Sequence, residues 1–547
     1  MSDERFPVIV VGGSVVGLTT AAFLSRYGVP VLVVERHPGE LMHPRARTIN
    51  PRSMEVYRQL GLDDRIAAER TYEDDPQALM IRVHTLTGEE RSRTRLAADD
   101  GGVRLSEFTP SPWAHIDQDR LEVLLRARAE ELGADVRFAT ELVSFEQDDE
   151  GVDAVIADLS TGRRRTVRAD YLVAADGNTS PVREALGIGR QGTGSLGHML
   201  SMVFEADLRP ALAGRRLGIC YTEEPTAGTV LLPHDGADRW VFGVPYHPED
   251  GESVDDVDDE RVVRMARAAV GDPTLPVRIL PQLRDGTKVL GYTIGAAVAE
   301  RFRAGRCFLV GDAAHVTPPT GAFGASAGIQ DAHNLAWKLT AVLRGHAGPG
   351  LLDSYDAERR PVADFTLRQA MLQLRLRTGG KLAASAPLEA AADYYAVVCG
   401  YRYSSAAVPA EDGEQPFAVP PRDLTGEPGT RAPHVSLERE GTTISTLDLY
   451  GGRMVLVCGP EGQVWARAGR RVAERDGFPL AAYTVGTDVS DPGGRWPSAH
   501  DVSASGAVLV RPDGFVAWRG ATLPDTSPDT VLADVFASVW HRARVAA

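Results

Sequence analysis

The sequence has few cysteines and no excess of positive charge. Its four cysteines, Cys220, Cys307, Cys399 and Cys458, are widely separated, which excludes a CxxC pair, a zinc-ligand spacing and a dense disulfide framework. Free thiols in a reducing cytoplasm fit this pattern. The formal net charge of -16 disfavours nucleic acid and anionic lipid as partners, because a surface that binds phosphate groups has to be basic.

A long uninterrupted apolar run is also missing. Residues 6 to 24 are apolar, but acidic residues precede them and glycines interrupt them, unlike a signal peptide or a membrane-spanning helix. The acidic stretch at residues 255 to 260 precedes a helical pattern, and carboxylates favour a helix N-terminus. We therefore expect a cytoplasmic protein without a membrane segment, and we interpret the acidic stretch as structural and not as a metal site.

The chain of 547 residues is too long for one core and predicts several domains. Residues 1–190 and 285–403 predict a discontinuous α/β nucleotide-binding domain with long helices. Residues 191–284 predict an antiparallel-sheet domain that faces the substrate. Residues 404–433 are rich in Pro, Gly and acidic residues and predict a linker, and residues 434–547 predict a small α/β domain.

Residues 8 to 35 read as strand, glycine turn, helix and strand. In Gly12-Gly13-Ser14-Val15-Val16-Gly17 the pattern GxGxxG holds at its first and third glycines, with Ser14 at the second. Gly12 permits the tight turn and Gly17 a close helix–strand contact, so that backbone N–H groups can approach a pyrophosphate at the helix N-terminus. Glu35, followed by Arg36, ends the second strand, where a carboxylate can accept hydrogen bonds from a ribose. The segment predicts a dinucleotide site, open to NAD or FAD, whereas Glu35 disfavours the 2′-phosphate of NADP.

A second segment favours flavin. It reads Gly311-Asp312-Ala313-Ala314-His315, then Pro318-Pro319-Thr320-Gly321, and then a helix start at Ala322 to Ser326 that includes Gly324 and Ala325. An acid at a strand end can hold ribityl hydroxyls, and a helix N-terminus offers positive potential to the N1/O2 edge of a reduced flavin. The alternative for Asp312 is a helix or turn cap. His315 is interpreted as a structural histidine.

The motifs GGSVVGL, PRARTINPRSME, QDRLE, ADGNTSPVR, GDAAHVTPPTGAFG, GIQDAHNLAWKL and LLDSYDAERRP follow one another over roughly the first 380 residues. Together they resemble the class A flavoprotein aromatic hydroxylases, of the p-hydroxybenzoate hydroxylase-like fold. Within that family the sequence is most similar to bacterial aromatic polyketide hydroxylases. The resemblance implies a glutathione-reductase-type FAD domain interleaved with a substrate sheet, and a thioredoxin-like C-terminal domain. Without CxxC that domain has no dithiol to cycle, so packing or self-association is its expected role.

The resemblance also implies roles for single residues. Arg45, with Arg47 as its rival, and Gln118 resemble FAD contacts of the family, and Leu142 resembles a backbone contact to adenine. Asp176 lies in a segment that resembles the family's DG motif, and its alternative is a turn cap. The backbone of Pro318 and Pro319 is expected beside the flavin where oxygen reacts.

The family's chemistry implies an FAD-dependent monooxygenase. NAD(P)H would dock transiently and reduce the flavin, and O2 would then form a flavin C4a-hydroperoxide that hydroxylates a polycyclic aromatic polyketide in antibiotic biosynthesis. Three alternatives stay open. The first is epoxidation or Baeyer-Villiger insertion by the same flavin C4a-hydroperoxide, the second is a flavin reductase of the same fold, and the third is a flavin-bound protein without catalysis.

Overall fold

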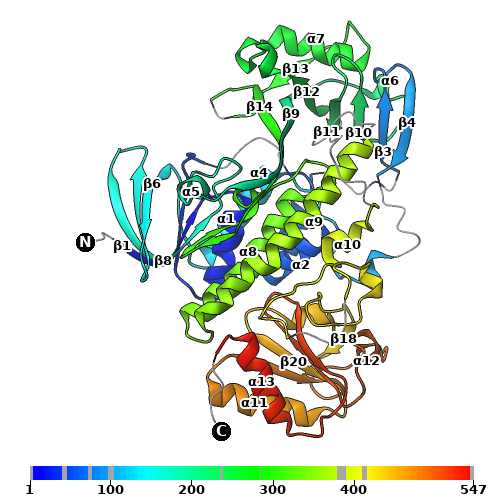
Figure 1. The fold of residues 1–547 in the computed structure, drawn as a ribbon. Coiled ribbons are helices and arrows are strands. Elements are labelled where there is room, and N and C mark those ends of the chain that lie inside the picture. Colours follow the sequence, from blue (N-terminus) through cyan, green and yellow to red (C-terminus); the bar gives the residue numbers. More distant parts are fainter. Residues whose placement is uncertain are drawn as a thin grey trace.

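The computed structural model describes residues 4–39, 46–71, 75, 77–96, 104–234, 238–283, 285–377, 390–409 and 415–542. Figure 1 shows a central α/β unit, a second sheet above it and a C-terminal unit below it. The two long helices α8 (Gly324–Leu343) and α9 (Asp353–Arg377) run through the centre of the molecule.

The central unit is built on a mostly parallel sheet. Its main strand order in the described residues is β15-β16-β8-β1-β2-β5, and β7 joins β6 to β8. The strands are β1 (Glu4–Val11), β2 (Val31–Val34), β5 (Asp135–Arg137), β6 (Thr140–Gln147), β7 (Val152–Asp158), β8 (Arg164–Ala174), β15 (Arg303–Ala304) and β16 (Cys307–Leu309). Its helices include α1 (Val15–Arg26), α2 (Pro51–Gln59), α3 (Asp63–Ala68), α4 (Gln118–Glu131), α5 (Pro181–Ala185) and α10 (Tyr394–Cys399).

The first strand, helix and strand follow the sequence prediction. The apolar residues of β1 pair in parallel with β2, Val8 opposite Val31 and Val11 opposite Val34, and α1 connects the two strands. The paired residues Val8–Val11 of β1 and Val31–Val34 of β2 are buried on both faces, as expected for a parallel sheet covered by helices. The carboxyl ends of these strands therefore meet at one edge of the sheet.

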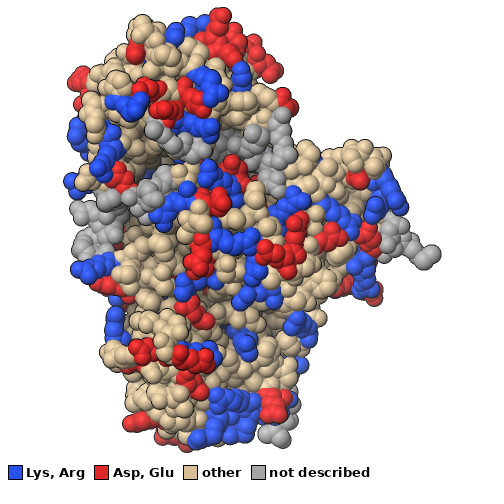
Figure 2. Space-filling view, turned by 180° about the vertical axis from the view of Figure 1, so that it is seen from behind, with Lys and Arg blue, Asp and Glu red and all other residues tan. Residues whose placement is uncertain are grey.

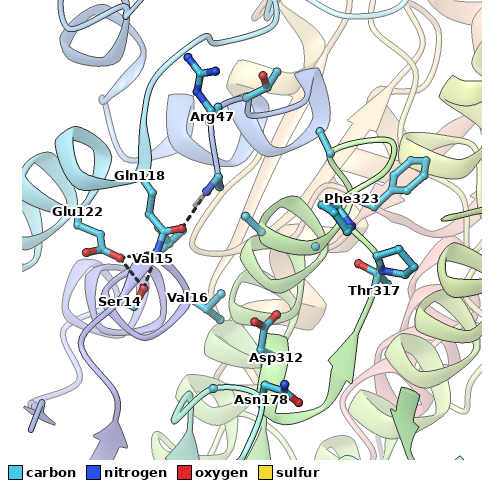
Figure 3. A pocket seen from close by; sticks show the side chains of 18 of the residues that line it. Ser14, Val15, Val16, Arg47, Gln118, Glu122, Asn178, Asp312, Thr317 and Phe323 are labelled. Carbon is cyan, nitrogen blue, oxygen red and sulfur yellow. Dashed lines mark hydrogen bonds between the residues drawn. The ribbon is translucent and has the colours of Figure 1, made fainter. Parts of the chain in front are cut away.

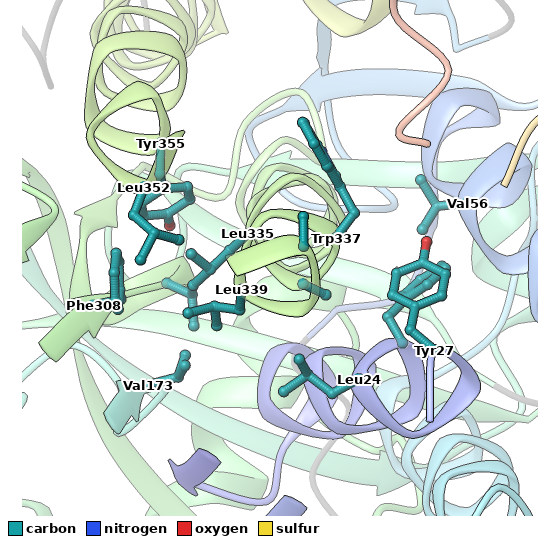
Figure 4. Close-up of a cluster of buried hydrophobic side chains, with 14 of the residues drawn as sticks. Leu24, Tyr27, Val56, Val173, Phe308, Leu335, Trp337, Leu339, Leu352 and Tyr355 are labelled. Atoms are coloured by element: carbon teal, nitrogen blue, oxygen red, sulfur yellow. The ribbon is translucent and has the colours of Figure 1, made fainter. Parts of the chain in front are cut away.

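Helix α8 forms the middle of the main core. All its residues from 326 to 341 are buried, so it is enclosed on every side. Figure 4 shows Leu335 and Leu339 of this helix near Leu24 of α1 and near side chains of the sheet, such as Val173. Trp337 points to another side of the helix, where its Nε1 donates to Asp513 of the C-terminal unit. This packing fixes the helix whose N-terminus the sequence assigns to flavin binding.

The second sheet is mostly antiparallel and has the main order β17-β14-β9-β12-β11-β10-β3-β4 in the described residues, with β13 beside β9. Its strands are β3 (Leu79–Val83), β4 (Glu90–Arg95), β9 (Arg190–Glu205), β10 (Leu217–Thr222), β11 (Thr229–Pro233), β12 (Arg239–Tyr246), β13 (Arg278–Leu280), β14 (Val289–Ala299) and β17 (His315–Val316). The sheet thus extends beyond the predicted range 191–284, because β3 and β4 join it from the N-terminal part and β14 and β17 from later residues.

Helices α6 (Arg209–Leu212) and α7 (Asp259–Val270) belong to this unit. The predicted acidic stretch lies at the start of α7, where Asp258 accepts a hydrogen bond from the N–H of Arg261 and Asp259 and Glu260 occupy the first turn. Within the described residues, no group of three or more His, Cys, Asp or Glu side chains is placed to hold a metal ion.

The C-terminal unit has the element order of a thioredoxin-like fold. Strands β20 (Met454–Cys458) and β21 (Leu480–Thr484) pair in parallel across α11 (Gln463–Asp476), and β22 (Ala507–Val510), β23 (Val516–Gly520) and α13 (Pro528–Val539) complete it. A hairpin of β18 (Ser436–Arg439) and β19 (Thr442–Ser445) and the short α12 (Trp496–Ala499) are added. Burial raises the pKa of Cys458 to about 12, so its thiol stays protonated at neutral pH.

The described part of the range predicted as a linker, residues 404–409 and 415–433, contacts the central unit. Arg431 is 1% exposed, and its guanidinium donates to both carboxylate oxygens of Glu55 on α2. The main apolar cluster also continues from the central unit into the C-terminal unit, where it includes Trp465 and Phe536. The domain boundaries stay predictions, but the C-terminal unit shares a core with the nucleotide-binding part.

The four cysteines are free and buried. No helix among the described residues is long and apolar enough to cross a membrane. Figure 2 shows Lys and Arg side chains interspersed with Asp and Glu over the face in view.

Candidate active site

A single large cavity of about 1510 Å³ joins the two sequence motifs to the second sheet. One end is lined by the glycine turn after β1 and by Glu35 after β2, and the middle by the segment from Val310 to Ala325. The other end is lined by Leu217, Ile219 and Trp240 of the second sheet. Small-ligand pockets usually measure about 300–1,000 Å³, so this cavity has room for a cofactor and a substrate together.

The glycine turn leaves no space for side chains. Gly12 has φ +108°, and a Cβ on it would lie 2.2 Å from the carbonyl oxygen of Ala175. A Cβ on Gly17 would lie 1.9 Å from the carbonyl oxygen of Gly12. Gly17 therefore acts by letting α1 approach the turn, as the sequence predicts, and does not itself line the cavity.

Glu35 lies at the end of β2 and faces the same turn. Its Oε2 accepts from the N–H of Gly13 at 2.7 Å, and its Oε1 accepts from the N–H of His37 at 2.8 Å. The carboxylate is thus held in a fixed orientation at the rim of the cavity. This placement suits the predicted contact with the ribose of an adenosine.

Three polar side chains form a cluster beside the start of α1 (Figure 3). The Ser14 hydroxyl donates to Glu122 Oε1 at 2.5 Å, and Gln118 Nε2 donates to Glu122 Oε1 at 2.8 Å and to Ser14 Oγ at 3.1 Å. Gln118 Oε1 accepts from the N–H of Ala46 at 3.1 Å. Sequence reasoning identified Gln118 and Ser14 but missed Glu122, although its spacing of four residues from Gln118 placed both on one face of α4.

Asp312 lies in a short 3-10 turn, Gly311–Ala313, between β16 and β17, and its side chain points into the cavity near Asn178 (Figure 3). The turn is anchored from α8, because Asp331 Oδ2 accepts from the N–H of Gly311 at 3.1 Å. The same carboxylate binds His315 Nε2 at 2.6 Å, and both side chains are buried. His315 is therefore held by a structural partner, as the sequence interpretation expected.

Two helices point their N-termini at the cavity. Among the described residues, no side chain caps the start of α1 or of α8 by a hydrogen bond, and the first residues of both helices line the cavity. Their backbone N–H groups and positive potential are available to a ligand with negative charge.

Asp176 combines the two interpretations that the sequence left open. Its carboxylate lines the cavity but also accepts from the Ser180 hydroxyl at 2.6 Å and from the N–H of Val182 at 3.0 Å. Burial raises the pKa of Asp176 above its ordinary value. Arg183 is buried and donates to the carbonyl oxygens of Asn178 and Thr179, so it stabilises the turn that follows Asp176.

Most of the predicted site residues are brought together. Those that line the cavity are Gly12, Ser14, Val15, Val16, Glu35, Arg36, Gln118, Leu142, Asp176, Asp312, Pro318, Pro319, Gly321, Gly324 and Ala325. Ser326 does not line it and instead accepts from the N–H of Asn50 at 3.3 Å inside the core. Arg45 lies outside the described residues, whereas its rival Arg47 lines the cavity, and its Nε donates to Asp117 at 2.9 Å.

Aromatic side chains that sequence reasoning missed line the part of the cavity beside the loop 317–323. Phe323 stacks on Tyr394, with ring centroids 5.3 Å apart, and Trp113 lies 5.4 Å from Tyr394. Tyr395 completes this aromatic wall, and its hydroxyl lies 3.4 Å from Nε1 of Trp113. The four rings come from three separate segments, so no local pattern could reveal the wall.

The residues present fit an FAD molecule. The turn at Gly12 admits only backbone, which is what a pyrophosphate requires, and Glu35 suits the adenosine ribose. Asp312 and the uncapped start of α8 suit the ribityl chain and the flavin ring. When bound, FAD supplies the redox and oxygen chemistry that protein side chains lack.

Comparison with known families agrees with this geometry. Residues 5–370 match the model described as FAD binding domain, and residues 425–539 match the model described as aromatic-ring hydroxylase, C-terminal. The chain belongs to the FAD-dependent aromatic-ring hydroxylases. Its membership confirms the family, the fold class and the FAD cofactor that the sequence motifs predicted.

Relatives and solved structures of this hydroxylase family match over nearly the whole chain. The tetracenomycin A2 monooxygenase-dioxygenase of Streptomyces glaucescens is 40% identical, covering 96% of this chain and 95% of the relative. The 4-methyl-5-nitrocatechol 5-monooxygenase of a Burkholderia species is 41% identical, covering 99% of this chain and 98% of the relative. A crystal structure of aklavinone-11 hydroxylase with FAD and aklavinone superposes with a TM-score of 0.90 at 38% identity, covering 99% of this chain and 100% of that one.

Proposed function

We propose that this hydroxylase uses NAD(P)H and O2 to add oxygen to a polycyclic aromatic polyketide in antibiotic biosynthesis. The observation that carries the proposal is the continuous cavity, in which the flavin site opens into a space walled by aromatic and aliphatic side chains. A flat, apolar, multi-ring molecule would bury its faces there. Tetracenomycin A2 and aklavinone, the compounds after which two similar enzymes are named, support this class.

The protein's own contribution is to bind and orient the two reactants and to exclude water. Leu217, Ile219 and Trp240 would form the apolar side of the substrate site and the aromatic wall another side. Thr317 Oγ1 is buried and has no hydrogen-bond partner among the described residues, so it is available to a ligand at the boundary between flavin and substrate. The carbonyl groups of Pro318 and Pro319 are proposed to face the place where oxygen reacts.

The electron donor is proposed to be a nicotinamide that binds transiently. The sequence shows only one βαβ segment with the dinucleotide pattern, at residues 8 to 35, and this segment is assigned to FAD. A donor that reacts and leaves needs no such module of its own.

A single-ring phenol is the second candidate substrate, favoured by the similarity to 4-methyl-5-nitrocatechol 5-monooxygenase. The whole cavity of about 1510 Å³ is larger than the usual single-ligand pocket, and this size supports a multi-ring substrate beside the cofactor. The two candidates differ in which compound stimulates oxidation of the donor.

The experiment is to purify the protein with FAD and to measure NADH and NADPH oxidation with aklavinone, tetracenomycin A2 and 4-methyl-5-nitrocatechol. The product is analysed by mass after reaction under oxygen-18. We expect a polyketide to stimulate donor oxidation and to gain one or more labelled oxygen atoms, and the ring connectivity separates hydroxylation from ring insertion. Turnover without oxygen would instead indicate a reductase, and stimulation by the nitrocatechol alone would refute the polyketide class.

A further inference from the structure

The loop between β17 and α8, residues 317–323, has an unusual backbone. Gly321 has φ +87° and the next residue, Ala322, has φ +55°. Glycine adopts such angles readily, but alanine does so rarely, because its Cβ approaches the following carbonyl oxygen. A left-handed alanine persists only where its surroundings hold it in place. The loop must therefore be fixed by contacts from outside.

Two helices provide these contacts. The Thr320 hydroxyl donates to the carbonyl oxygen of Ala370 on α9 at 2.8 Å. The Tyr394 hydroxyl, at the start of α10, donates to the carbonyl oxygen of Gly321 at 2.8 Å. The ring of Tyr394 also stacks on Phe323, with an interplanar angle of 19°. Tyr394 thus contacts the loop at the first residue of the left-handed pair and at the residue that directly follows the pair.

Tyr394 is itself held rigidly. The carboxylate of Asp393 caps α10 by accepting from the N–H of Ala396 at 3.0 Å, and the ring of Tyr394 lies 5.5 Å from that of Tyr395 in an edge-to-face arrangement. Burial raises the pKa of Tyr394 well above its ordinary value. Its hydroxyl therefore stays protonated and able to donate at neutral pH.

We propose that Tyr394 is a positioning residue for the flavin, because it holds the loop 317–323 in the geometry that aims the first N–H groups of α8 at the flavin ring. The inference rests on the proposed placement of that ring beside this loop. Tyr394 acts through the carbonyl group of Gly321 and is not assigned a contact with the flavin. Because Tyr394 also belongs to the aromatic wall, it joins the substrate side of the cavity to the flavin side.

The test compares three variants as purified apoproteins titrated with FAD. Tyr394→Phe keeps the stacked ring and removes only the hydroxyl, and Tyr394→Leu removes both. Tyr450→Phe is the matched control, since its buried hydroxyl has no partner among the described residues and lies in the C-terminal unit. A neutral hydrogen bond has a net value of about 1 kcal/mol, and FAD binding must restore the loop geometry that the apoprotein of Tyr394→Phe loses, so we expect FAD to bind up to about fivefold more weakly. Tyr394→Leu should bind it more weakly still, and the control should match the parent.

Two further measurements distinguish positioning from general loss of structure. The flavin midpoint potential of Tyr394→Phe should become more negative, because displaced N–H groups stabilise the reduced flavin less. Hydrogen exchange should rise in residues 317–324 and stay unchanged in the C-terminal unit. Parent-like FAD affinity, potential and exchange in Tyr394→Phe would overturn the proposal, even if Tyr394→Leu fails to fold. Failure of every polyketide in the turnover assay would refute the substrate class and leave these flavin measurements valid.

Discussion

Replacement of Glu358 by glutamine should strongly destabilise the contact between α9 and the C-terminal unit. Glu358 Oε1 accepts from Arg511 Nη1 at 2.6 Å and from the Ser405 hydroxyl at 2.7 Å. Its Oε2 accepts from Arg511 Nη2 at 2.8 Å, from Lys338 Nζ at 2.7 Å and from Asn334 Nδ2 at 2.8 Å. The side chains of Glu358, Arg511 and Lys338 are all fully buried.

The expected loss of stability in Glu358→Gln depends on which buried charges remain without a partner. Burial by itself raises the pKa of Glu358, but the nearby Arg511 and Lys338 hold it well below its ordinary value, so the residue is ionised. In Glu358→Gln, Arg511 keeps Asp513 as a partner, whereas Lys338 loses its carboxylate. Breaking a buried ion pair on one side typically costs about 3–5 kcal/mol, and we expect a loss of this size in the free energy of unfolding.

The assay is denaturation by urea, followed by flavin fluorescence and by circular dichroism, because several units are present and one probe could miss a partial transition. Arg471→Gln breaks an ion pair with Asp529 on the surface of the same C-terminal unit and should leave the midpoint unchanged. Lys338→Met added to Glu358→Gln removes the stranded cation and should recover part of the loss. If Glu358→Gln is as stable as Arg471→Gln, the buried cluster does not hold the units together.

Three further outcomes follow from single residues. Gly12→Ala should yield protein without bound flavin in its absorption spectrum, because the added Cβ would lie 2.2 Å from a carbonyl oxygen. Asp312→Ala should weaken FAD binding about 10- to 100-fold in equilibrium titrations, the usual value of a hydrogen bond to a charged group. Burial lowers the pKa of His500 to about 4, so the unfolded chain binds the extra proton between pH 6.5 and 4, and stability falls on acidification. Between pH 7.5 and 5 this histidine alone should lower the free energy of unfolding by about 2 kcal/mol. His500→Asn should remove this part of the pH dependence, as measured by denaturation curves at the two pH values.

The nucleotide-binding turn could be predicted from the sequence because its determinants are local. Gly12, Gly17 and Glu35 lie within one strand, helix and strand, and their roles depend on contacts among neighbouring segments. The second motif was predictable for the same reason, since Asp312 and the start of α8 are close in sequence. Ser326 shows the limit of this reasoning, because the residue lies in the motif but its side chain turns into the core.

The aromatic wall and the buried ion pairs could not be predicted in this way. Arg431 and Glu55 are 376 residues apart, and Arg511 and Glu358 are 153 residues apart. A charged residue on a long helix is usually solvated, so the sequence favours an exposed position for Glu358. The polar strand β4, residues 90 to 95, likewise has no apolar alternation and becomes a strand only by pairing with β3.

These long-range contacts give the C-terminal unit a physical role that needs no dithiol. The start of α8, where we expect the flavin, lies near Asp331, which holds Gly311, and the following turns of the same helix carry Asn334 and Lys338. Those two side chains meet Glu358, which Arg511 of the C-terminal unit neutralises. Without that arginine, Glu358 would keep Lys338 as a cation, but the buried Asp513 would lose its salt-bridge partner at the contact between α8, α9 and the C-terminal unit. The C-terminal unit therefore stabilises the helix whose start we expect to bind the flavin, through buried contacts to Asn334, Trp337 and Glu358.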